Sequence, residues 1–235
     1  MVLSCYLYSR GVLAVCFQSS WSSRASWPRF GVSAVDAAAA VDDSSVGTID
    51  ELRAASNSCT GTVADPTTIT LAADIADPAA QVDINCHAVL ALAGHDLAVR
   101  NLVISSNQAL TIVDTGTGGT LTADAGETSD VAGIQNTGAT LTVASGTIAA
   151  TGGLYAAGIG GGPSGDGGIT TINGGTVIAT TVSAGDSGGS SAVGPGDGGA
   201  SFGSLSVNGG VLRLPSGFLR VPDSAGVEIT VGPGG

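Results

Sequence analysis

The sequence predicts an all-β protein whose strands stack as a parallel β-helix, preceded by one short helix. From residue 59 onward, short alternating runs of Val, Ile, Leu and Thr recur without a helical period, and each run ends at Gly or Asn. Residues 140–151 realign on 169–180 with a shift of 29 positions, and 203–214 realign on that second copy with a shift of 35. Glycine makes up 38 of the 235 residues but has no three-residue period, which excludes a collagen-like chain.

The expected strands all have this short, alternating pattern. They are Thr68–Leu71, Leu97–Ile104, Leu110–Val113, Thr120–Ala123, Thr140–Val143, Thr147–Ala150, Ile169–Ile172, Thr176–Ala179, Leu205–Val207 and Gly226–Val231. Glycine-rich segments at 131–138, 156–162 and 191–197 alternate with the later strands, and each contains one small apolar pair. The repeating unit is therefore strand, glycine corner, strand and glycine-rich excursion.

Such a unit exposes both edges of every strand, so it becomes stable only when successive units stack about 4.8 Å apart and share one narrow core. Ala, Val, Ile and Thr fit a core of that width. Asn-Gly-Gly corners at 173–175 and 208–210 supply the positive φ angles that sharp turns need. An aligned β-sandwich is the main alternative, but it would not require the same corner motif three times.

One short helix is expected within residues 46–58. Thr48 and Glu51 form a capping-box pattern at its start. Leu52 and Ala55 lie on one face at helical spacing. We interpret this helix as a lid over the first strands and not as a separate domain.

Residues 1–45 differ in composition from the rest of the chain. Six of the nine aromatic residues lie within the first thirty positions. Apolar segments at 2–7 and 11–17, followed by small residues at 37–40, give a partial match to an export signal. The alternative is an upstream extension that never folds. The expected organisation is a leader or disordered extension over 1–45 and the parallel β-helix over 46–235.

Residues 146–180 have the sequence GTIAATGGLYAAGIGGGPSGDGGITTINGGTVIAT. This segment resembles the Gly-rich repeats of bacterial secreted and cell-surface proteins with a right-handed parallel β-helix, some of which are labelled carbohydrate-binding. The upstream stretches TIDELRAA, TTITLAADI and VLALAGHDLAVRNLVI resemble the capping helix and first turns of the same group. The resemblance spans roughly residues 48–200 and implies a right-handed fold with an N-terminal capping helix. No catalytic signature accompanies these repeats.

Cys59 and Cys86 are the two cysteines of the expected β-helix, because Cys5 and Cys16 fall in the leader. An even pair in an exportable chain that contains no Lys favours a disulfide, which would join the end of the helix to an early strand. Two buried thiols are the alternative. A metal site would need more ligands than this spacing offers.

Polar residues in the turns provide few candidates for chemistry. His95 and Asp96 could act as a base and its orienting carboxylate, but adjacent residues of a strand face opposite sides, so we expect His95 to be a turn residue that bonds to backbone. Asp166, Asp186 and Asp197 each stand in a glycine-rich turn, where they could bind calcium or could bond to their own backbone. We expect no catalytic residue, no metal site and no cofactor.

The charge balance limits the function further. Nineteen acidic and seven basic residues give a net charge of −12, which excludes binding to a phosphate backbone. No apolar run is long enough for a transmembrane helix. We expect a non-enzymatic secreted or cell-surface module for display, adhesion or carbohydrate binding, whose partner is an extracellular glycan or another surface protein. A degenerate polysaccharide-processing enzyme is the alternative, although such enzymes need clustered carboxylates beside Arg or Lys.

Ice binding is a third possibility, based on Thr-apolar-Thr segments. Residues 68–70, 120–122 and 140–142 have this form, and 204–206 has it with serine. With the middle residue inward, both hydroxyl groups point outward and could align in ranks about 4.8 Å apart. Thr is also a common residue at exposed strand positions, which is the simpler explanation.

The expected last strand, 226–231, is followed by Gly-Pro-Gly-Gly and by no capping element. An uncovered end of stacked strands is an aggregation hazard. We therefore expect that the chain is a fragment of a longer protein or that this end stacks on a partner.

Overall fold

The computed structural model describes residues 43–127, 130–182, 189–215 and 219, and the strand backbone of 3–6, 15–18 and 228–234. The chain divides into two compact units, Met1–Ala38 and Ala39–Gly235. In the first unit, β1 (Leu3–Tyr6) and β2 (Val15–Gln18) pair antiparallel. The leader or extension expected over 1–45 stays a prediction.

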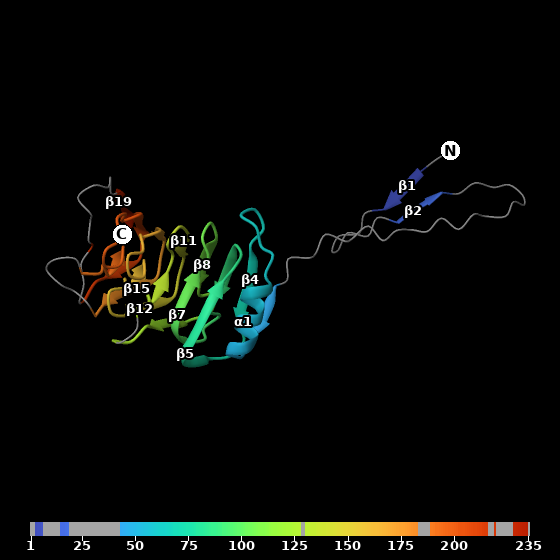
Figure 1. Ribbon diagram of the computed structural model, residues 1–235. Coiled ribbons are helices and arrows are strands. Elements are labelled where there is room, and N and C mark those ends of the chain that lie inside the picture. The colour runs from blue at the N-terminus through green and yellow to red at the C-terminus, as the bar shows by residue number, and fades with distance from the viewer. Residues whose placement is uncertain are drawn as a thin grey trace, which may run out of the picture. The chain divides into compact units, whose positions relative to one another are not determined.

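The described strands of the second unit form two sheets of parallel strands (Figure 1). The eight-stranded sheet contains, in spatial order, β3 (Ser44–Val46), β4 (Thr67–Leu71), β6 (Ala88–Ala91), β8 (Ala109–Val113), β11 (Thr140–Val143), β14 (Ile169–Ile172), β17 (Ser204–Gly209) and β19 (Glu228–Gly234). The nine-stranded sheet contains β5 (Ile75–Ile84), β7 (Leu97–Ile104), β9 (Thr120–Asp124), β10 (Ile134–Gln135), β12 (Thr147–Gly152), β13 (Ile159–Gly160), β15 (Thr176–Thr181), β16 (Val193–Gly194) and β18 (Val211–Arg213). The chain moves back and forth between the two sheets, and it returns to each sheet beside a strand that it formed earlier.

The sequence repeat sets the register of the strands. Thr140 pairs with Ile169, and Thr147 pairs with Thr176, which is the shift of 29 positions found in the sequence. Ile169 pairs in turn with Ser204, which is the shift of 35. β-Branched residues dominate these strands because they pack well on a pleated surface. The prediction of parallel strands is confirmed for the second unit, in which α1 is the one helix among the described residues.

Every run that was expected to be a strand forms one. The glycine-rich excursions, which were not expected to contain strands, also form short ones. Each contains a two-residue strand, and these strands (β10, β13 and β16) pair with one another in the nine-stranded sheet. Gly160 and Gly194 pair at positive φ angles of 142° and 127°. A Cβ atom on Gly160 would collide with the carbonyl oxygen of Gly194. Glycine therefore allows the two backbones to approach closely enough to pair. The sequence pattern had indicated only loops in these segments.

Strands β5 and β6 were also not predicted. The pairing of β5 with β7 shifts between Asp77 and Gln81, so the apolar alternation of β5 is interrupted at a bulge. Pro78 lies within this interruption, where no ladder hydrogen bond is needed.

The helix α1 (Ile49–Ser58) is confirmed, with Thr48 as its N-cap. The Glu51 amide donates to the Thr48 hydroxyl at 3.3 Å, and the Glu51 carboxylate accepts from the Thr48 amide at 3.1 Å. Leu52 is fully buried, and the helix packs against β5, where the Arg53 guanidinium donates to the carbonyl oxygen of Gln81 at 2.9 Å. The helix thus covers the first strands as expected.

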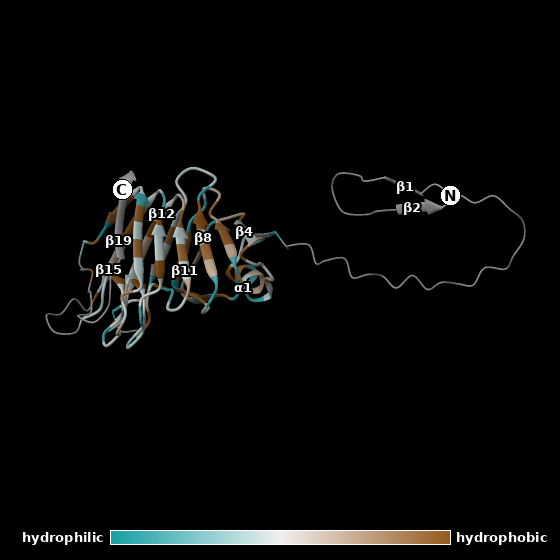
Figure 2. Cartoon of the chain, turned by 90° about the horizontal axis from the view of Figure 1, so that it is seen from above, coloured by the Kyte–Doolittle hydropathy of each residue, from teal (hydrophilic) through white to brown (hydrophobic). Residues whose placement is uncertain are grey.

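Alternate side chains of the strands point into one continuous core, and hydrophobic residues are prominent in strands such as β4 and β8 (Figure 2). Inward residues of successive strands stack in rows: Leu110, Leu141, Thr170 and Leu205 form one such row. The Thr170 hydroxyl is satisfied by the amide of Asn136 at 3.0 Å, which allows a polar side chain within the row. The expected last strand is present as β19, but its side chains lie outside the described residues.

Candidate functional site

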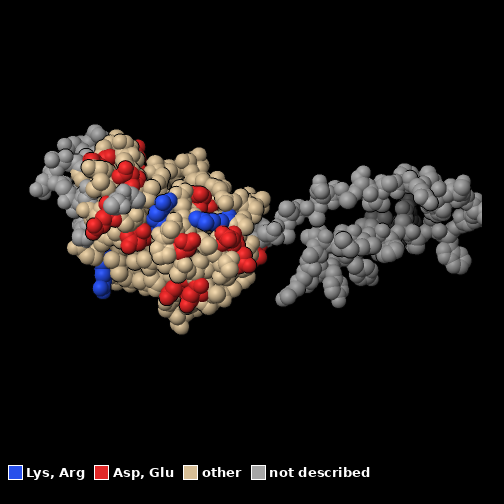
Figure 3. Space-filling view, turned by 60° about the horizontal axis from the view of Figure 1, so that its bottom comes forward, with Lys and Arg blue, Asp and Glu red and all other residues tan. Residues whose placement is uncertain are grey.

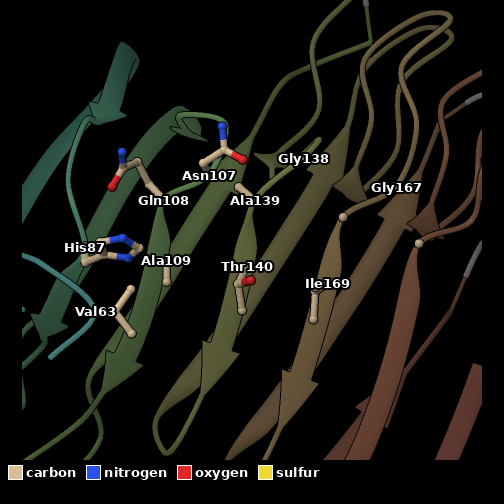
Figure 4. A pocket seen from close by; sticks show the side chains of 12 residues that line it. Val63, His87, Asn107, Gln108, Ala109, Gly138, Ala139, Thr140, Gly167 and Ile169 are labelled. Carbon is tan, nitrogen blue, oxygen red and sulfur yellow. The ribbon is translucent and has the colours of Figure 1, made fainter.

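A groove of about 630 Å³ runs across the eight-stranded sheet near the points where its strands begin. Its lining comes from the loop before β4 and from the starts of β6, β8, β11, β14 and β17. The lining residues are Val63, His87, Asn107, Gln108, Ala109, Gly138, Ala139, Thr140, Gly167, Gly168, Ile169 and Gly203. Figure 4 shows Ala109, Thr140 and Ile169 in a row on neighbouring strands, with His87 and Val63 at one end.

Backbone hydrogen bonds between neighbouring repeats form the floor of the groove. The Thr140 amide donates to the Gln108 carbonyl at 3.0 Å, and the Ile169 amide donates to the Ala139 carbonyl at 3.0 Å. A Cβ atom on Gly168 would collide with a carbonyl oxygen of the preceding repeat, so glycine keeps this floor low. Because these backbone groups are already paired, a ligand must bind through side chains and through apolar contact.

A disulfide holds the end wall of the groove. Cys59 and Cys86 are bonded, with their Cα atoms 5.8 Å apart, so the predicted disulfide is confirmed. Cys86 immediately precedes His87, whose amide donates to the Gly61 carbonyl at 3.3 Å. The loop that begins at Cys59 is therefore fixed next to His87, and it presents Val63, which is 81% exposed.

The lining of the groove contains no Asp, Glu, Lys or Arg side chain. The amide side chains of Asn107 and Gln108 and the hydroxyl of Thr140 have no hydrogen-bond partner among the described residues, so they are available to a ligand. The buried Nδ1 atom of His87 also lacks a partner within that part of the chain. Ile169, which is 50% exposed, adds an apolar contact. This chemistry suits a neutral ligand with hydroxyl groups and apolar faces.

A row of hydroxyl groups lies beside the groove on the same sheet. Thr111, Thr142, Thr171 and Ser206 occupy paired positions on β8, β11, β14 and β17, and we call these four residues the hydroxyl file. All four side chains are half-buried on the outward face. Thr111, Thr142 and Thr171 each lie two residues beyond a lining residue of the groove, and Ser206 lies three residues beyond Gly203. Neighbouring members are separated by the distance between strands, about 4.8 Å.

The Thr-apolar-Thr segments do not all lie on one sheet, so the expected alignment of their hydroxyl groups is wrong for residues 120–122. Residues 120–122 belong to β9 in the nine-stranded sheet, whereas 68–70 and 140–142 belong to β4 and β11 in the eight-stranded sheet. The spacing of 20 between 120–122 and 140–142 takes the chain from one sheet to the other, and it is shorter than a full repeat. In the nine-stranded sheet, the paired residues are instead Thr120, Thr147 and Thr176.

Several carboxylates hold neighbouring repeats together. Asp114 accepts hydrogen bonds from the amides of Gly94 at 2.7 Å, Gly116 at 3.0 Å and Gly119 at 2.9 Å. Desolvation raises the pKa of Asp114, but the amides, led by Gly119, outweigh it and hold the pKa below the ordinary value. Figure 3 shows other acidic side chains scattered over a largely uncharged surface.

His95 is a turn residue, as expected, since its amide donates to the Leu92 carbonyl at 2.9 Å. Its ring, however, does not bond to backbone: Nδ1 lies 3.1 Å from Oδ1 of Asp74. The Asp96 amide, at 3.0 Å, and the His95 ring lower the pKa of the Asp74 carboxyl. His95 and Asp96 thus do not form a pair of base and orienting carboxylate, because Asp96 accepts from the Thr120 amide instead.

The three aspartates weighed as calcium ligands do not converge in the described structure. Asp166 accepts from the amides of Ala200 and Ser201, both at 2.8 Å, so it bonds to the next repeat and not to its own turn. Asp197 lies in that next repeat, and Asp186 lies outside the described residues. Among the described residues, no three His, Cys, Asp or Glu side chains come together as a metal site.

No protein-family model, curated protein or solved structure matches this chain. Within the described part, no helix is long and apolar enough to cross a membrane. The groove was not predicted from the sequence, although a signal exists: the positions just before β8, β11, β14 and β17, which are 108, 139, 168 and 203, hold Gln or small residues.

Proposed function

We propose that the chain is a non-enzymatic extracellular module with a right-handed parallel β-helix, and that its groove binds an extended, uncharged carbohydrate. The observation that supports this most is the groove itself, which crosses successive strands and has a neutral lining of amide, hydroxyl and apolar groups. A polymer can contact one repeat after another along such a path. Adhesion to a glycan-covered surface follows from binding of that kind.

The strand pairing supports the β-helix part of the proposal. From β8 onward, one strand of the eight-stranded sheet and then strands of the nine-stranded sheet follow in each repeat, and every pairing between repeats is parallel. Parallel strands connected through a crossover are right-handed in about 98% of cases, because of the right-handed twist of strands. The proposed handedness follows from this rule.

The disulfide and the carboxylates support an extracellular binding role. The disulfide between Cys59 and Cys86 is stable in an oxidising compartment. Asp114, Asp74 and Asp166 are engaged by backbone amides, which leaves them poorly placed for acid–base chemistry. The groove offers hydrogen-bonding groups to a sugar, and Ile169 offers an apolar contact.

The test uses two matched substitutions in the full chain. Ala109→Trp places a large side chain in the groove, whereas Ala149→Trp places the same side chain at an outward, half-buried position of β12. Co-sedimentation with insoluble cellulose, chitin and xylan measures binding. We expect the wild type and Ala149→Trp to be retained on at least one polymer, and Ala109→Trp to be lost from it. Equal retention of both variants, or no retention of the wild type, would contradict the proposal.

Ice binding is a second candidate, favoured by the paired threonines Thr120, Thr147 and Thr176 on the nine-stranded sheet. Their outward hydroxyl groups repeat at the strand spacing of about 4.8 Å on a face without the groove. Thermal hysteresis that is abolished by Thr147→Tyr and retained by Ala109→Trp would support this candidate. Absence of hysteresis would reject it.

A further inference from the structure

We propose that the groove holds a linear, uncharged pyranose chain that runs perpendicular to the strands, with one sugar unit for each strand and the hydroxyl file as its line of hydrogen-bonding partners. This inference rests on the proposed function and adds the orientation of the sugar chain, its repeat of one sugar unit for each strand, and the residues that form hydrogen bonds with it.

The binding groups repeat once for each strand. Along the groove, Ala109, Thr140 and Ile169 occupy paired positions on β8, β11 and β14. The hydroxyl file runs parallel to them, two residues further along each strand, at a separation of about 7 Å. A ligand lying across the strands therefore meets an equivalent pair of positions at each step of about 4.8 Å.

This step discriminates between extended polymers. An extended peptide advances by about 3.3 Å per residue, so its side chains would fall out of register with the strands after two steps. An extended chain of equatorially linked pyranose rings advances by nearly one strand spacing per ring. Only the second kind of chain can place one ring, with a ring hydroxyl group, opposite each member of the hydroxyl file.

The charge of the site selects a neutral chain. The groove lining contains no Asp, Glu, Lys or Arg, and the members of the hydroxyl file are uncharged. A net charge of −12 opposes the approach of acidic polysaccharides at low ionic strength. The described arginines do not compensate, because Arg53, Arg100 and Arg213 lie on α1, β7 and β18 and none of them lines the groove. Arg53 and Arg100 both bond to Gln81 of β5.

The extent of the groove limits the number of sugar units. The lining reaches from His87, just before β6, to Gly203, just before β17, so it crosses five neighbouring strands of the eight-stranded sheet. Four separations of about 4.8 Å give a path of roughly 19 Å. We therefore expect contact with about five sugar units.

The first experiment measures affinity against ligand length in the full chain. Cello-, chito- and xylo-oligosaccharides from the dimer to the octamer are titrated by isothermal calorimetry. We expect affinity for the preferred series to increase up to about five units and then to stay constant, because longer chains extend beyond the groove. Affinity that does not change beyond the dimer would overturn the proposed orientation.

The second experiment removes hydroxyl groups without changing shape. The double variant Thr142→Val/Thr171→Val alters the hydroxyl file, and the matched control Thr147→Val/Thr176→Val alters the paired threonines of the nine-stranded sheet. Loss of two hydrogen bonds predicts about 30-fold weaker binding of the pentamer by the first variant. We expect a change below about twofold for the control.

These outcomes separate the inference from the proposed function. If Ala109→Trp abolishes binding but the two double variants bind equally well, the groove binds carbohydrate without hydrogen bonds to the hydroxyl file. In that case the inference is wrong and the proposed function stands. If none of the three oligosaccharide series binds the wild type, both the inference and the proposed function fail.

Discussion

Replacement of Asp114 by Asn tests whether turn carboxylates, and not only the hydrophobic core, join the repeats. Asp114 follows β8, and its Oδ1 atom accepts from the amides of Gly94 and Gly116, while Oδ2 accepts from the amide of Gly119. Gly94 belongs to the preceding repeat. The Asp114 carboxylate therefore fixes its own turn and connects it to a neighbour at the same time.

The size of the effect follows from these three hydrogen bonds. Asparagine keeps the shape of the side chain, but one of its two terminal atoms becomes a donor and cannot accept from an amide. One or more of the three amides then loses its partner, and the remaining bonds lose the contribution of the negative charge. A hydrogen bond to a charged group contributes about 1.5–3 kcal/mol, so we expect Asp114→Asn to lower the free energy of unfolding by about 2 kcal/mol.

The dependence on pH gives the sharper signature. The folded-state pKa of Asp114 lies below its ordinary value of 3.8, because the amides of Gly119, Gly94 and Gly116 outweigh the effect of desolvation. A depressed pKa contributes stability that is present above the unfolded-state value and is lost as the pH falls through the folded-state value. The difference between wild type and variant should therefore be full at neutral pH and should shrink below about pH 4.

Urea unfolding followed by circular dichroism at several pH values measures this difference. Asp124→Asn is the matched control, since among the described residues the exposed Asp124 carboxylate accepts only the Gly126 amide, within its own turn, at 3.1 Å. We expect a loss below about 0.5 kcal/mol for this surface substitution. Equal losses for the two variants, or a loss for Asp114→Asn that does not decrease at low pH, would contradict the stabilising role of the Asp114 carboxylate.

Three further predictions concern stability. Cys59→Ser/Cys86→Ser opens a loop closed across a sequence separation of 27, so it should lower the free energy of unfolding by about 3.5 kcal/mol in urea titrations; a loss below about 1 kcal/mol would contradict this. Gly160→Ala should lower the free energy of unfolding by at least about 2 kcal/mol in thermal unfolding, because the new Cβ atom meets a backbone oxygen at a positive φ angle. The control Gly126→Ala has a φ angle of 72° and open space around it, so it should cost only about 1 kcal/mol. Equal costs for the two variants would argue against the close approach of the backbones at Gly160. Asn136→Ala removes the two hydrogen bonds of a fully buried amide group, at 3.1 and 3.0 Å, and should cost about 2 kcal/mol in the same assay; an unchanged midpoint would show that these bonds are not needed.

The sequence allowed the parallel strands and their register to be predicted because both follow from side-chain pattern. The shift of 29 reappears as the pairing of Thr140 with Ile169, since a stacked repeat must place equivalent residues side by side. The helix cap at Thr48 was predictable for a similar reason, because a capping box is a local interaction. The disulfide could be predicted from an even pair of cysteines in the folded part of an exportable chain that contains no Lys.

What could not be predicted depends on contacts between repeats. The short strands at Ile134, Ile159 and Val193 lie in glycine-rich segments without alternation, and only the approach of neighbouring backbones makes them strands. The carboxylate of Asp166 resembles an ordinary turn aspartate in sequence, yet it bonds to the repeat that follows. The groove is also a product of stacking, because no single repeat contains more than a small part of its lining.

A neutral sugar chain is claimed to lie along the groove, and an amide NMR map of the full chain shows whether it does. A cello-, chito- or xylo-pentamer is added, and shift changes are recorded for each assigned amide. We predict changes at 107–109, 138–142 and 167–171, which include most of the groove lining and Thr142 and Thr171 of the hydroxyl file, and none at Thr147 or Thr176 on the nine-stranded sheet. Shift changes confined to the nine-stranded sheet, or no changes with any of the three pentamers, would contradict the claim.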